Sequence, residues 1–261
     1  MKRGTLFLLA LSMLLCLAGC KEKEEKSKPK RPDMDALRAA EVGSYVFFGE
    51  YEQDNDASTG KEAIEWLVLD KQEDKMLVIS RYGLDCQPYN TEDAPVTWET
   101  CSLRGWLNGE FFETAFIPEE KSMILTSMVS VETASADMTS AIVDGEIVTD
   151  EYTIMFHGVP GTAVPTVKDR VFLLSVEEAY RYFTDDAARK CSVTPYCNKQ
   201  EAYSQSDFGT CYWWLRSPGS FTDYASCVDL IGGVDSDGCK VDYIVLAVRP
   251  ALWIDTSIPD R

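Results

Sequence analysis

Histidine, paired cysteine motifs and basic residues are what this 261-residue chain has least of. Its single histidine, His157, is accompanied by no GxSxG nucleophile elbow, so no catalytic triad can be recognised. The sequence also contains no phosphate-binding glycine loop. The nine cysteines include no CxxC pair, which removes the usual spacing of a zinc site. We therefore expect neither an enzyme nor a zinc protein.

Basic residues are scarce beside acidic ones. Lys and Arg number 25 and Asp and Glu 43, for a formal net charge of −18. The first 32 residues hold eight of the basic and three of the acidic residues, so the remainder carries 17 against 40, a net charge of −23. Because nucleic-acid phosphates attract the opposite sign, this balance excludes nucleic acid as a partner. A solvated acidic surface, neutral-sugar contacts and cation-mediated contacts all remain open.

The amino terminus has the pattern of an export signal. Lys2-Arg3 precedes an apolar run from Leu6 to Ala18, which is shorter than the roughly twenty residues of a membrane-spanning helix. The run ends at Leu17-Ala18-Gly19-Cys20, which resembles the lipobox of bacterial lipoproteins. We expect a signal peptide over 1–19, then a lipidated Cys20 and a charged tether over 20–41, because Lys21 to Pro32 contains no apolar residue. The expected location is the outer face of the cell membrane, and an ordinary secretory signal is the alternative.

Residues 42–255 predict one domain, followed by a tail over 256–261. Strands are expected over 43–51, 64–69, 76–80 and 171–174, the middle two as a hairpin. Two main helices are expected, one over 97–108 ended by Gly109 and one after a capping box formed by Ser175 and Glu178. Residues 127–166 lack this regularity and predict an insertion that contains a small hairpin at Asp144-Gly145.

Aromatic and arginine residues in apolar surroundings are expected to be structural. Trp213 and Trp214 are consecutive strand residues and point to opposite faces. Packing of both beneath an inserted loop is expected, with one in the core and its neighbour at a sugar-stacking or partner surface as the alternative. Arg216 and Arg249 are expected to be structural, each paired to a carboxylate, and not ligand-binding. The full structural set is Trp98, Trp106, Trp213, Trp214, Arg216, Arg249 and Trp253.

Seven cysteines follow Cys20, and two pairs flank polar loops. Cys86 with Cys101, and Cys227 with Cys239, are candidate disulfides because oxidising compartments outside the cytoplasm permit such bridges. A bridge of the first span would contribute about 3 kcal/mol.

The segment 219–243 is rich in Asp, Ser, Gly and Tyr, which suits an adaptable binding surface. Asp235-Ser-Asp237-Gly238 faintly resembles a calcium loop, although a tight turn explains the glycine equally well. We therefore list Asp235 and Asp237 as a weak Ca²⁺ candidate and expect no other cofactor. The predicted ligand-binding residues are Phe221, Asp223, Tyr224, Asp229, Asp235, Asp237, Asp242 and Tyr243.

Several ordered blocks together resemble a bacterial family described as a domain of unknown function, number 6273. The blocks are GLDCQPYN (83–90), TWETCSLRGWLN (97–108), TAFIPEE (114–120), VFLLSVEEA (171–179), WWLRSPG (213–219) and VRPALWI (248–254). The chain departs from the family pattern in the length of 127–166 and in Cys197, Cys227 and Cys239. The carboxy-terminal order of strands and hairpin is similar to C-type-lectin-like domains, including those of sulfatase-modifying enzymes. The resemblance implies an α+β fold with a mixed antiparallel sheet and two main helices.

The family name implies no activity. The lectin motifs EPN, QPD and WND and the oxidase cysteine site are not recognisable, so the lectin-like similarity implies the scaffold alone. Together, these features predict a membrane-anchored lipoprotein that binds a glycan or protein outside the cell. An envelope enzyme, a hydrolase or an oxidase on the same scaffold, and a purely structural lipoprotein are the alternatives.

Overall fold

The computed structural model describes residues 32–132, 141–143, 146–148, 164–205 and 209–258. The predicted signal peptide, Cys20, most of the tether and His157 lie outside these ranges. Helices and sheets are mixed along the described chain, which is therefore of the α+β class. No helix within the described ranges is both long and apolar enough to cross a bilayer.

Two sheets make the framework. The first has four strands in the order β1 (Tyr45–Tyr51), β2 (Glu62–Lys71), β3 (Lys75–Ser80) and β15 (Ala251–Asp255), all antiparallel. The second has five strands in the order β13 (Val234–Lys240), β12 (Tyr224–Val228), β11 (Trp213–Pro218), β14 (Ala247–Val248) and β4 (Asp85–Cys86). Only its β11–β14 pair is parallel. The predicted hairpin at 64–80 is confirmed as β2 and β3.

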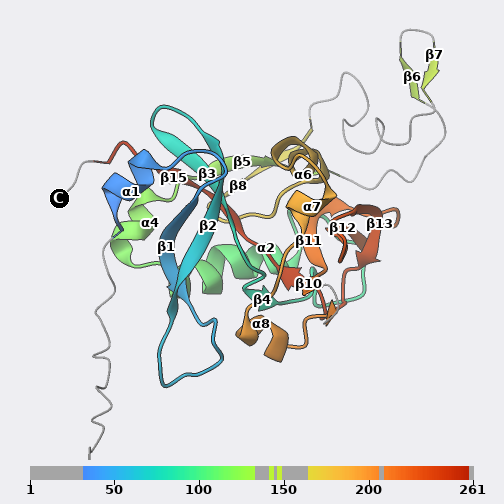
Figure 1. Cartoon of the computed structure of the whole chain (residues 1–261). Coiled ribbons are helices and arrows are strands. Elements are labelled where there is room, and N and C mark those ends of the chain that lie inside the picture. Colours follow the sequence, from blue (N-terminus) through green and yellow to red (C-terminus); the bar gives the residue numbers. More distant parts are fainter. Residues whose placement is uncertain (1–31, 133–140, 144–145, 149–163, 206–208, 259–261) are drawn as a thin grey trace, which may run out of the picture.

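The remaining elements are three two-stranded sheets and several short helices, most of which are labelled in Figure 1. Two-stranded sheets are β5 (Ser127–Ser130) with β8 (Thr166–Asp169), β6 (Ala141–Val143) with β7 (Glu146–Val148), and β9 (Ser204–Gln205) with β10 (Thr210–Cys211). The helices are α1 (Met34–Ala39), α2 (Ser102–Trp106), the π-helical turn η1 (Leu107–Phe111), α3 (Phe112–Ala115), α4 (Pro118–Met123), α6 (Val176–Tyr182), α7 (Asp186–Arg189) and α8 (Pro195–Lys199).

The chain passes between the sheets twice, once from β3 to β4 and once from β14 to β15. The two passages lie against each other, because the Ser80 amide donates to the Pro250 carbonyl at 2.9 Å. The Arg249 Nε donates to the Ser80 carbonyl at 2.8 Å. The last strand thus pairs with the amino-terminal sheet, and the two sheets share one junction.

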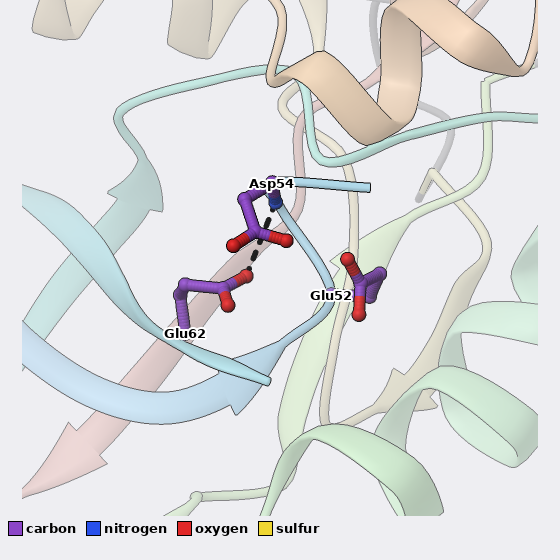
Figure 2. Close-up of side chains that lie close together, drawn as sticks. All are labelled: Glu52, Asp54 and Glu62. Atoms are coloured by element: carbon purple, nitrogen blue, oxygen red, sulfur yellow. Dashed lines mark hydrogen bonds between the residues drawn. The ribbon is translucent and has the colours of Figure 1, made fainter. Parts of the chain in front are cut away.

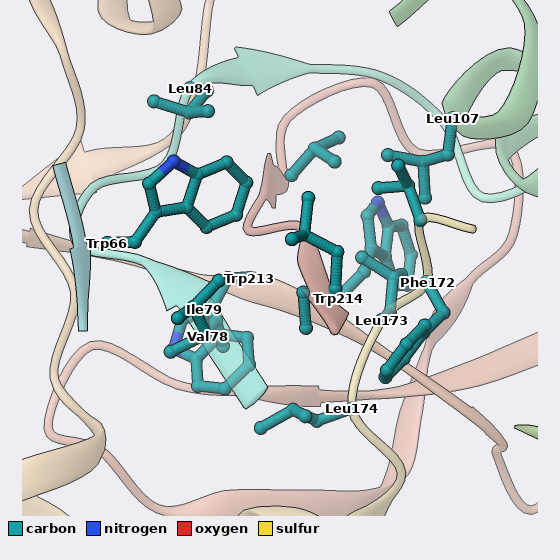
Figure 3. Packing of buried hydrophobic residues seen from close by; sticks show 14 of the residues in the cluster. Trp66, Val78, Ile79, Leu84, Leu107, Phe172, Leu173, Leu174, Trp213 and Trp214 are labelled. Carbon is teal, nitrogen blue, oxygen red and sulfur yellow. The ribbon is translucent and has the colours of Figure 1, made fainter. Parts of the chain in front are cut away.

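One hydrophobic core continues through both sheets. Figure 3 shows Trp66 of β2, Trp213 and Trp214 of β11, and Phe172 packed among aliphatic side chains. The three tryptophans have no exposed surface. Fully burying a large apolar side chain stabilises a fold by about 1.5–3 kcal/mol, so these rings anchor the junction of the sheets.

The first predicted helix is displaced toward the carboxy terminus. Helical structure runs through α2, η1 and α3, so the prediction that Gly109 ends a helix at residue 108 is wrong. Gly109 lies within the π-helical turn, and Phe111 and Phe112 beyond it are 1% exposed. Burial of those two rings outweighs the modest cost of a glycine inside a helix.

The second predicted helix is confirmed as α6. The Ser175 Oγ accepts from the Glu178 amide at 3.1 Å, and a Glu178 carboxylate oxygen accepts from the Ser175 amide at 2.9 Å. The expected strand 171–174 is wrong as a strand: its residues are buried, but they form only one bridge, between Phe172 and Ala251. Phe172 exchanges two hydrogen bonds with Ala251, and the Leu174 carbonyl accepts from the Arg216 amide, so the segment is held between the two sheets without forming a strand of its own.

The two ends of the predicted insertion pair with each other in a regular two-stranded sheet, so they are part of the ordered fold. Ser127 pairs with Asp169 and Ser130 with Thr166 in β5–β8, and Val129 is 4% exposed. Within the insertion, β6 pairs with β7 as the predicted hairpin requires. Residues 133–140, 144–145 and 149–163 lie outside the described ranges.

Candidate functional site

The β12–β13 hairpin, at one edge of the five-stranded sheet, carries four of the eight predicted ligand-binding residues, and the other four flank it. The structure divides these residues between the two ends of the hairpin. Phe221, Asp223, Tyr224, Asp242 and Tyr243 lie where β11 leads into β12 and where β13 ends. Asp229 lies in the opposite turn, and Asp235 and Asp237 lie within β13. The eight residues therefore do not form a single site.

The first end, defined here as the aromatic end, is built around Tyr224 and Lys240. These two residues are cross-strand partners in β12 and β13, so their side chains share one face. The Lys240 Nζ donates to the Asp93 Oδ2 at 2.8 Å and lies 4.0 Å from the Asp223 Oδ2. The hydrogen bond to Asp93 is the main cause of the raised pKa of Lys240, and the charges of Asp93, Asp223 and Asp242 add to it.

Two aromatic rings complete the aromatic end. The rings of Phe221 and Tyr224 meet edge to face with centroids 5.2 Å apart, and Phe221 is 62% exposed. Tyr243, which follows β13, is 48% exposed. Asp242 Oδ1 is buried and accepts no hydrogen bond within the described part of the chain. This end therefore combines exposed aromatic surface, carboxylate acceptors and one ammonium donor.

A distant loop holds the aromatic end in place. The Val96 amide donates to the Thr222 carbonyl at 2.9 Å, and the Asn90 amide donates to the Val241 carbonyl at 2.8 Å. The loop between these residues also supplies Asp93. Sequence reasoning missed both Asp93 and Lys240, because 147 positions separate them and no local pattern marks either one.

Asp229 and Asp235 accept hydrogen bonds from backbone amides, and Asp237 accepts one from a side chain. Asp229 Oδ1 accepts from the amides of Ile231 at 2.9 Å and Gly233 at 2.8 Å. Asp235 Oδ1 accepts from the Gly238 amide at 3.0 Å, and an Asp237 oxygen accepts from the Ser220 hydroxyl. The tight-turn alternative thus accounts for Asp235. These contacts give Asp229 and Asp235 structural roles and do not support the weak Ca²⁺ candidate.

A different group of carboxylates has a geometry suited to a metal ion. Glu52, Asp54 and Glu62 each offer an oxygen within 4.8 Å of the others, and among the described residues this is the group of three or more that could hold an ion. Figure 2 shows the group at the β1–β2 connection, where the Asp54 amide donates to Glu62 at 3.2 Å. The pKa of Glu52 is raised by desolvation and by the charges of Glu62 and Asp54. Three oxygen ligands suit a hard cation such as Ca²⁺, although exposed acidic groups are common without one.

Both tryptophans of β11 are buried, so both have the packing role expected of them and neither offers the alternative sugar-stacking surface. The Trp213 Nε1 donates to the Arg189 carbonyl at 3.1 Å, and the Trp214 Nε1 donates to the Gln87 carbonyl at 3.0 Å. The two indoles point to opposite faces of β11, so chain near Arg189 covers one face of this central strand and chain near Gln87 covers the other. Each indole also finds a partner for its N–H, as a buried tryptophan requires.

Arg216 has the predicted carboxylate partner. It is 3% exposed and forms an ion pair with Glu178, with its Nη2 3.0 Å from Glu178 Oε1. Its Nη1 also donates to the Leu173 carbonyl at 2.8 Å, and its Nη2 to the Ser130 hydroxyl at 3.0 Å. The pair therefore joins β11, β5 and the capping box of α6.

Arg249 is buried like Arg216, but the prediction that it pairs with a carboxylate is wrong. Its Nε donates to Ser80, and its guanidinium lies 4.9 Å from the Trp213 ring centroid and 5.3 Å from that of Phe183. Its Nη1 makes no hydrogen bond to a described residue. The aromatic faces take the place of a counter-ion, since a cation over an aromatic ring is attracted by its quadrupole.

The remaining predicted structural tryptophans differ in burial. Trp98 is 1% exposed, and its Nε1 donates at 2.8 Å to Asp169, which also accepts from Arg104 at 2.7 Å. Trp106 and Trp253 are partly buried against the core. The Lys75 ammonium lies 4.8 Å from the centroid of the Trp253 ring.

The seven cysteines of the described chain are free thiols. Cys86 and Cys101 have different surroundings: the Cys86 thiol donates to the Ile244 carbonyl at 2.8 Å, and the Cys101 sulfur accepts from the Arg104 amide at 3.4 Å. Each sulfur thus has its own backbone partner, and the structure contains no bridge between them. The sulfurs of Cys227 and Cys239 lie 3.6 Å apart.

A buried carboxylate on the other edge strand was not singled out by sequence reasoning. Asp85 in β4 accepts from the Tyr51 hydroxyl and from the Cys86 amide. Desolvation raises the pKa of Asp85 above its usual value despite these hydrogen bonds. Its position in the short motif LDC gives no signal of burial, because β4 is covered only when the rest of the fold forms.

Comparison with curated proteins and with solved structures finds no match. The family model described as "Domain of unknown function (DUF6273)" matches residues 73–256, which is more than half of the chain. The match spans β3 to β15 and includes the junction of the sheets, the aromatic end and the buried Arg216 pair. This chain therefore belongs to the DUF6273 family.

Proposed function

We propose that the chain is a lipid-anchored recognition module on the outer face of a bacterial cell membrane, and that its aromatic end binds a glycan or protein ligand. The anchor rests on the lipobox-like sequence before Cys20 and on the charged, apolar-free segment after it. The scaffold proposed is C-type-lectin-like. Two sheets joined by paired crossings, with a hairpin at the free edge, support that proposal.

The observation that carries the binding proposal is the exposed Phe221–Tyr224 pair beside a lysine that lies between carboxylates. Aromatic rings give rigid contact area at low conformational cost, and neighbouring polar groups orient the ligand. Asp93 and Asp223 can accept hydrogen bonds from hydroxyl groups, and the Lys240 ammonium can donate them. Such a combination fits the faces and hydroxyls of a sugar ring.

Local charge narrows the ligand class. Lys240 is accompanied by Asp93, Asp223 and Asp242, so acidic groups outnumber basic ones at the aromatic end. Like charges oppose phosphorylated or sulfated ligands, whereas neutral sugars and basic protein segments are tolerated. A neutral glycan is the first ligand to test, and a basic protein surface is the second.

A glycan array probed with the full chain, with Ca²⁺ and then with a chelator, tests the binding proposal. Phe221→Ala is expected to weaken binding about tenfold or more, as for a central aromatic contact. Phe47→Ala is the matched control, because Phe47 in β1 is also 62% exposed but lies in the other sheet. Equal binding by Phe221→Ala, Asp223→Asn and the unchanged chain would remove the aromatic end as the site.

The anchor has a separate test. Expression of the full chain in a bacterial host with labelled fatty acid is expected to label the protein, and Cys20→Ser should abolish both the label and membrane retention. Retention of the Cys20→Ser protein in the membrane fraction at the unchanged level would contradict lipid anchoring through this cysteine.

A further inference from the structure

Two thiols face each other across the β12–β13 hairpin. The Cys227 and Cys239 sulfurs are 3.6 Å apart, which is the distance of two sulfur atoms in contact. A disulfide needs about 2.05 Å between the sulfurs, so closure requires an approach of about 1.5 Å. Both residues lie in paired strands of one hairpin, so a small adjustment of side chains and strands can bring about this approach.

A bulge in β13 creates this contact. Cys227 pairs with Asp235, but Ala225 pairs with Cys239, so β13 has two more residues than β12 between these pairs. Gly238 forms the bend with φ of +78°, and its amide is held by Asp235 Oδ1 at 3.0 Å. Without the bulge Cys239 would not lie beside Cys227. The aspartate–glycine turn therefore has a second consequence, the placement of a thiol pair.

The two thiols differ in access and in acidity. Cys227 has no exposed surface, whereas Cys239 is partly exposed at the edge of the sheet. The hydrogen bond between the two sulfurs lowers the pKa of Cys239 and raises that of Cys227. A reagent from solvent thus meets Cys239 first, and this sulfur is the more readily ionised of the two.

We propose that Cys227 and Cys239 form a thiol–disulfide exchange site that takes a small disulfide, such as oxidised glutathione, as its co-substrate and closes a cross-strand bridge. The Cys239 thiolate attacks one sulfur of the small disulfide, whose S–S bond breaks and whose second sulfur leaves as a thiolate. Cys227 then gives up its proton and attacks Cys239, and the second small thiolate leaves. The dithiol loses two electrons and two protons, and the small disulfide becomes two thiols.

The order of attack gives the proposal its sharpest test. Cys227 acts as the resolving thiol, so Cys227→Ser should accumulate a stable mixed disulfide on Cys239. Cys239→Ser leaves only the fully buried thiol of the pair, so it should form neither the bridge nor a mixed disulfide at Cys227. Cys86→Ser is the matched control, because a serine hydroxyl can still donate to the Ile244 carbonyl and the pair is untouched.

The experiment incubates the full chain with oxidised and reduced glutathione at defined ratios, quenches with an alkylating reagent under denaturing conditions and maps the peptides by mass spectrometry. The unchanged chain and Cys86→Ser are expected to lose two alkylatable thiols and to yield a peptide that joins residues 227 and 239. Reduction should restore both thiols. This result does not depend on whether the aromatic end binds a ligand.

Two results would overturn the proposal. One is full alkylation of Cys227 and Cys239 in the unchanged chain at glutathione ratios that oxidise other cysteines of the same protein. The other is a mixed disulfide that stays on Cys239 although Cys227 is present, since the pair would then not close. The measurement on the unchanged chain decides the matter even if a variant fails to fold.

Discussion

Strands β11 and β13 belong to the same sheet and are separated only by β12, yet their environments are opposite. The first five residues of β11, Trp213 to Ser217, are buried, whereas no residue of β13 is fully buried. The central strand is covered on both faces by chain from distant parts of the sequence, and the edge strand faces solvent. We infer that the sheet combines a rigid centre, which holds aromatic and arginine side chains, with an edge free to carry function.

The largest expected effect on stability comes from replacing a tryptophan of the central strand β11 with alanine. Trp213→Ala is expected to lower the free energy of unfolding by about 4 kcal/mol, because it removes a fully buried indole and leaves a cavity. Phe221→Ala at the edge should change it by no more than about 0.5 kcal/mol. Urea unfolding followed by circular dichroism measures both. Similar losses in the two variants would contradict the division.

The next effect compares two ion pairs. Arg216→Met leaves Glu178 without its buried partner and is expected to cost about 3 kcal/mol. Arg181→Met breaks an exposed i,i+4 pair with Glu177 and should cost less than about 0.5 kcal/mol. Chemical denaturation of the two variants checks the difference, and a cost below about 1 kcal/mol for Arg216→Met would mean that the pair is not buried in solution.

A glycine substitution tests whether the edge strand β13 contains a position whose backbone conformation requires glycine. Gly238→Ala is expected to destabilise by about 2 kcal/mol, because φ is +78° and a Cβ would lie 2.3 Å from the Ala225 carbonyl oxygen. Gly109→Ala meets nothing within 4 Å in a helical turn and should stabilise by about 0.5–1 kcal/mol. Thermal unfolding gives both signs. Destabilisation by Gly109→Ala would restore the view that this glycine ends a helix.

The smallest effect compares the two edges of the five-stranded sheet through pH. Burial raises the pKa of Asp85 in β4, so the native state binds this proton more tightly than the unfolded state does. Stability from this group is therefore fully present below the usual aspartate pKa and is lost as the pH rises through the folded value. Asp85→Asn should flatten the fall in unfolding free energy above about pH 4. At the other edge, no residue of β13 is buried. Urea unfolding of Asp85→Asn and of the unchanged chain over a series of pH values measures the difference, and equal slopes would contradict the prediction.

Local sequence was sufficient where the interaction itself is local. The β2–β3 hairpin follows from two apolar runs around a short polar connector, and the start of α6 follows from Ser175 and Glu178. In each case residues a few positions apart satisfy one another.

Contacts between residues that are far apart in the sequence could not be predicted from local patterns. Asp93 and Lys240 meet only because β12, β13 and the loop at 90–96 come together, and no periodic pattern marks that meeting. Arg249 illustrates the same limit, because its neighbours are the aromatic rings of Trp213 and Phe183 and not the expected carboxylate. The bulge in β13 was not predicted either, although its Asp-Ser-Asp-Gly sequence was interpreted as a turn or a calcium loop.

By itself the sequence determined the β2–β3 hairpin and the start of α6, because hydrophobic periodicity, capping and turn chemistry act over a few residues. The α+β class was implied by the resemblance of its ordered blocks to a known family. Only the tertiary structure decided which tryptophans are covered, which aspartates accept hydrogen bonds within turns, which lysine lies beside the exposed rings, and which two thiols lie in contact. Those outcomes depend on the order of strands in the sheet. That order is set by the total burial of one continuous core and not by any single stretch of chain.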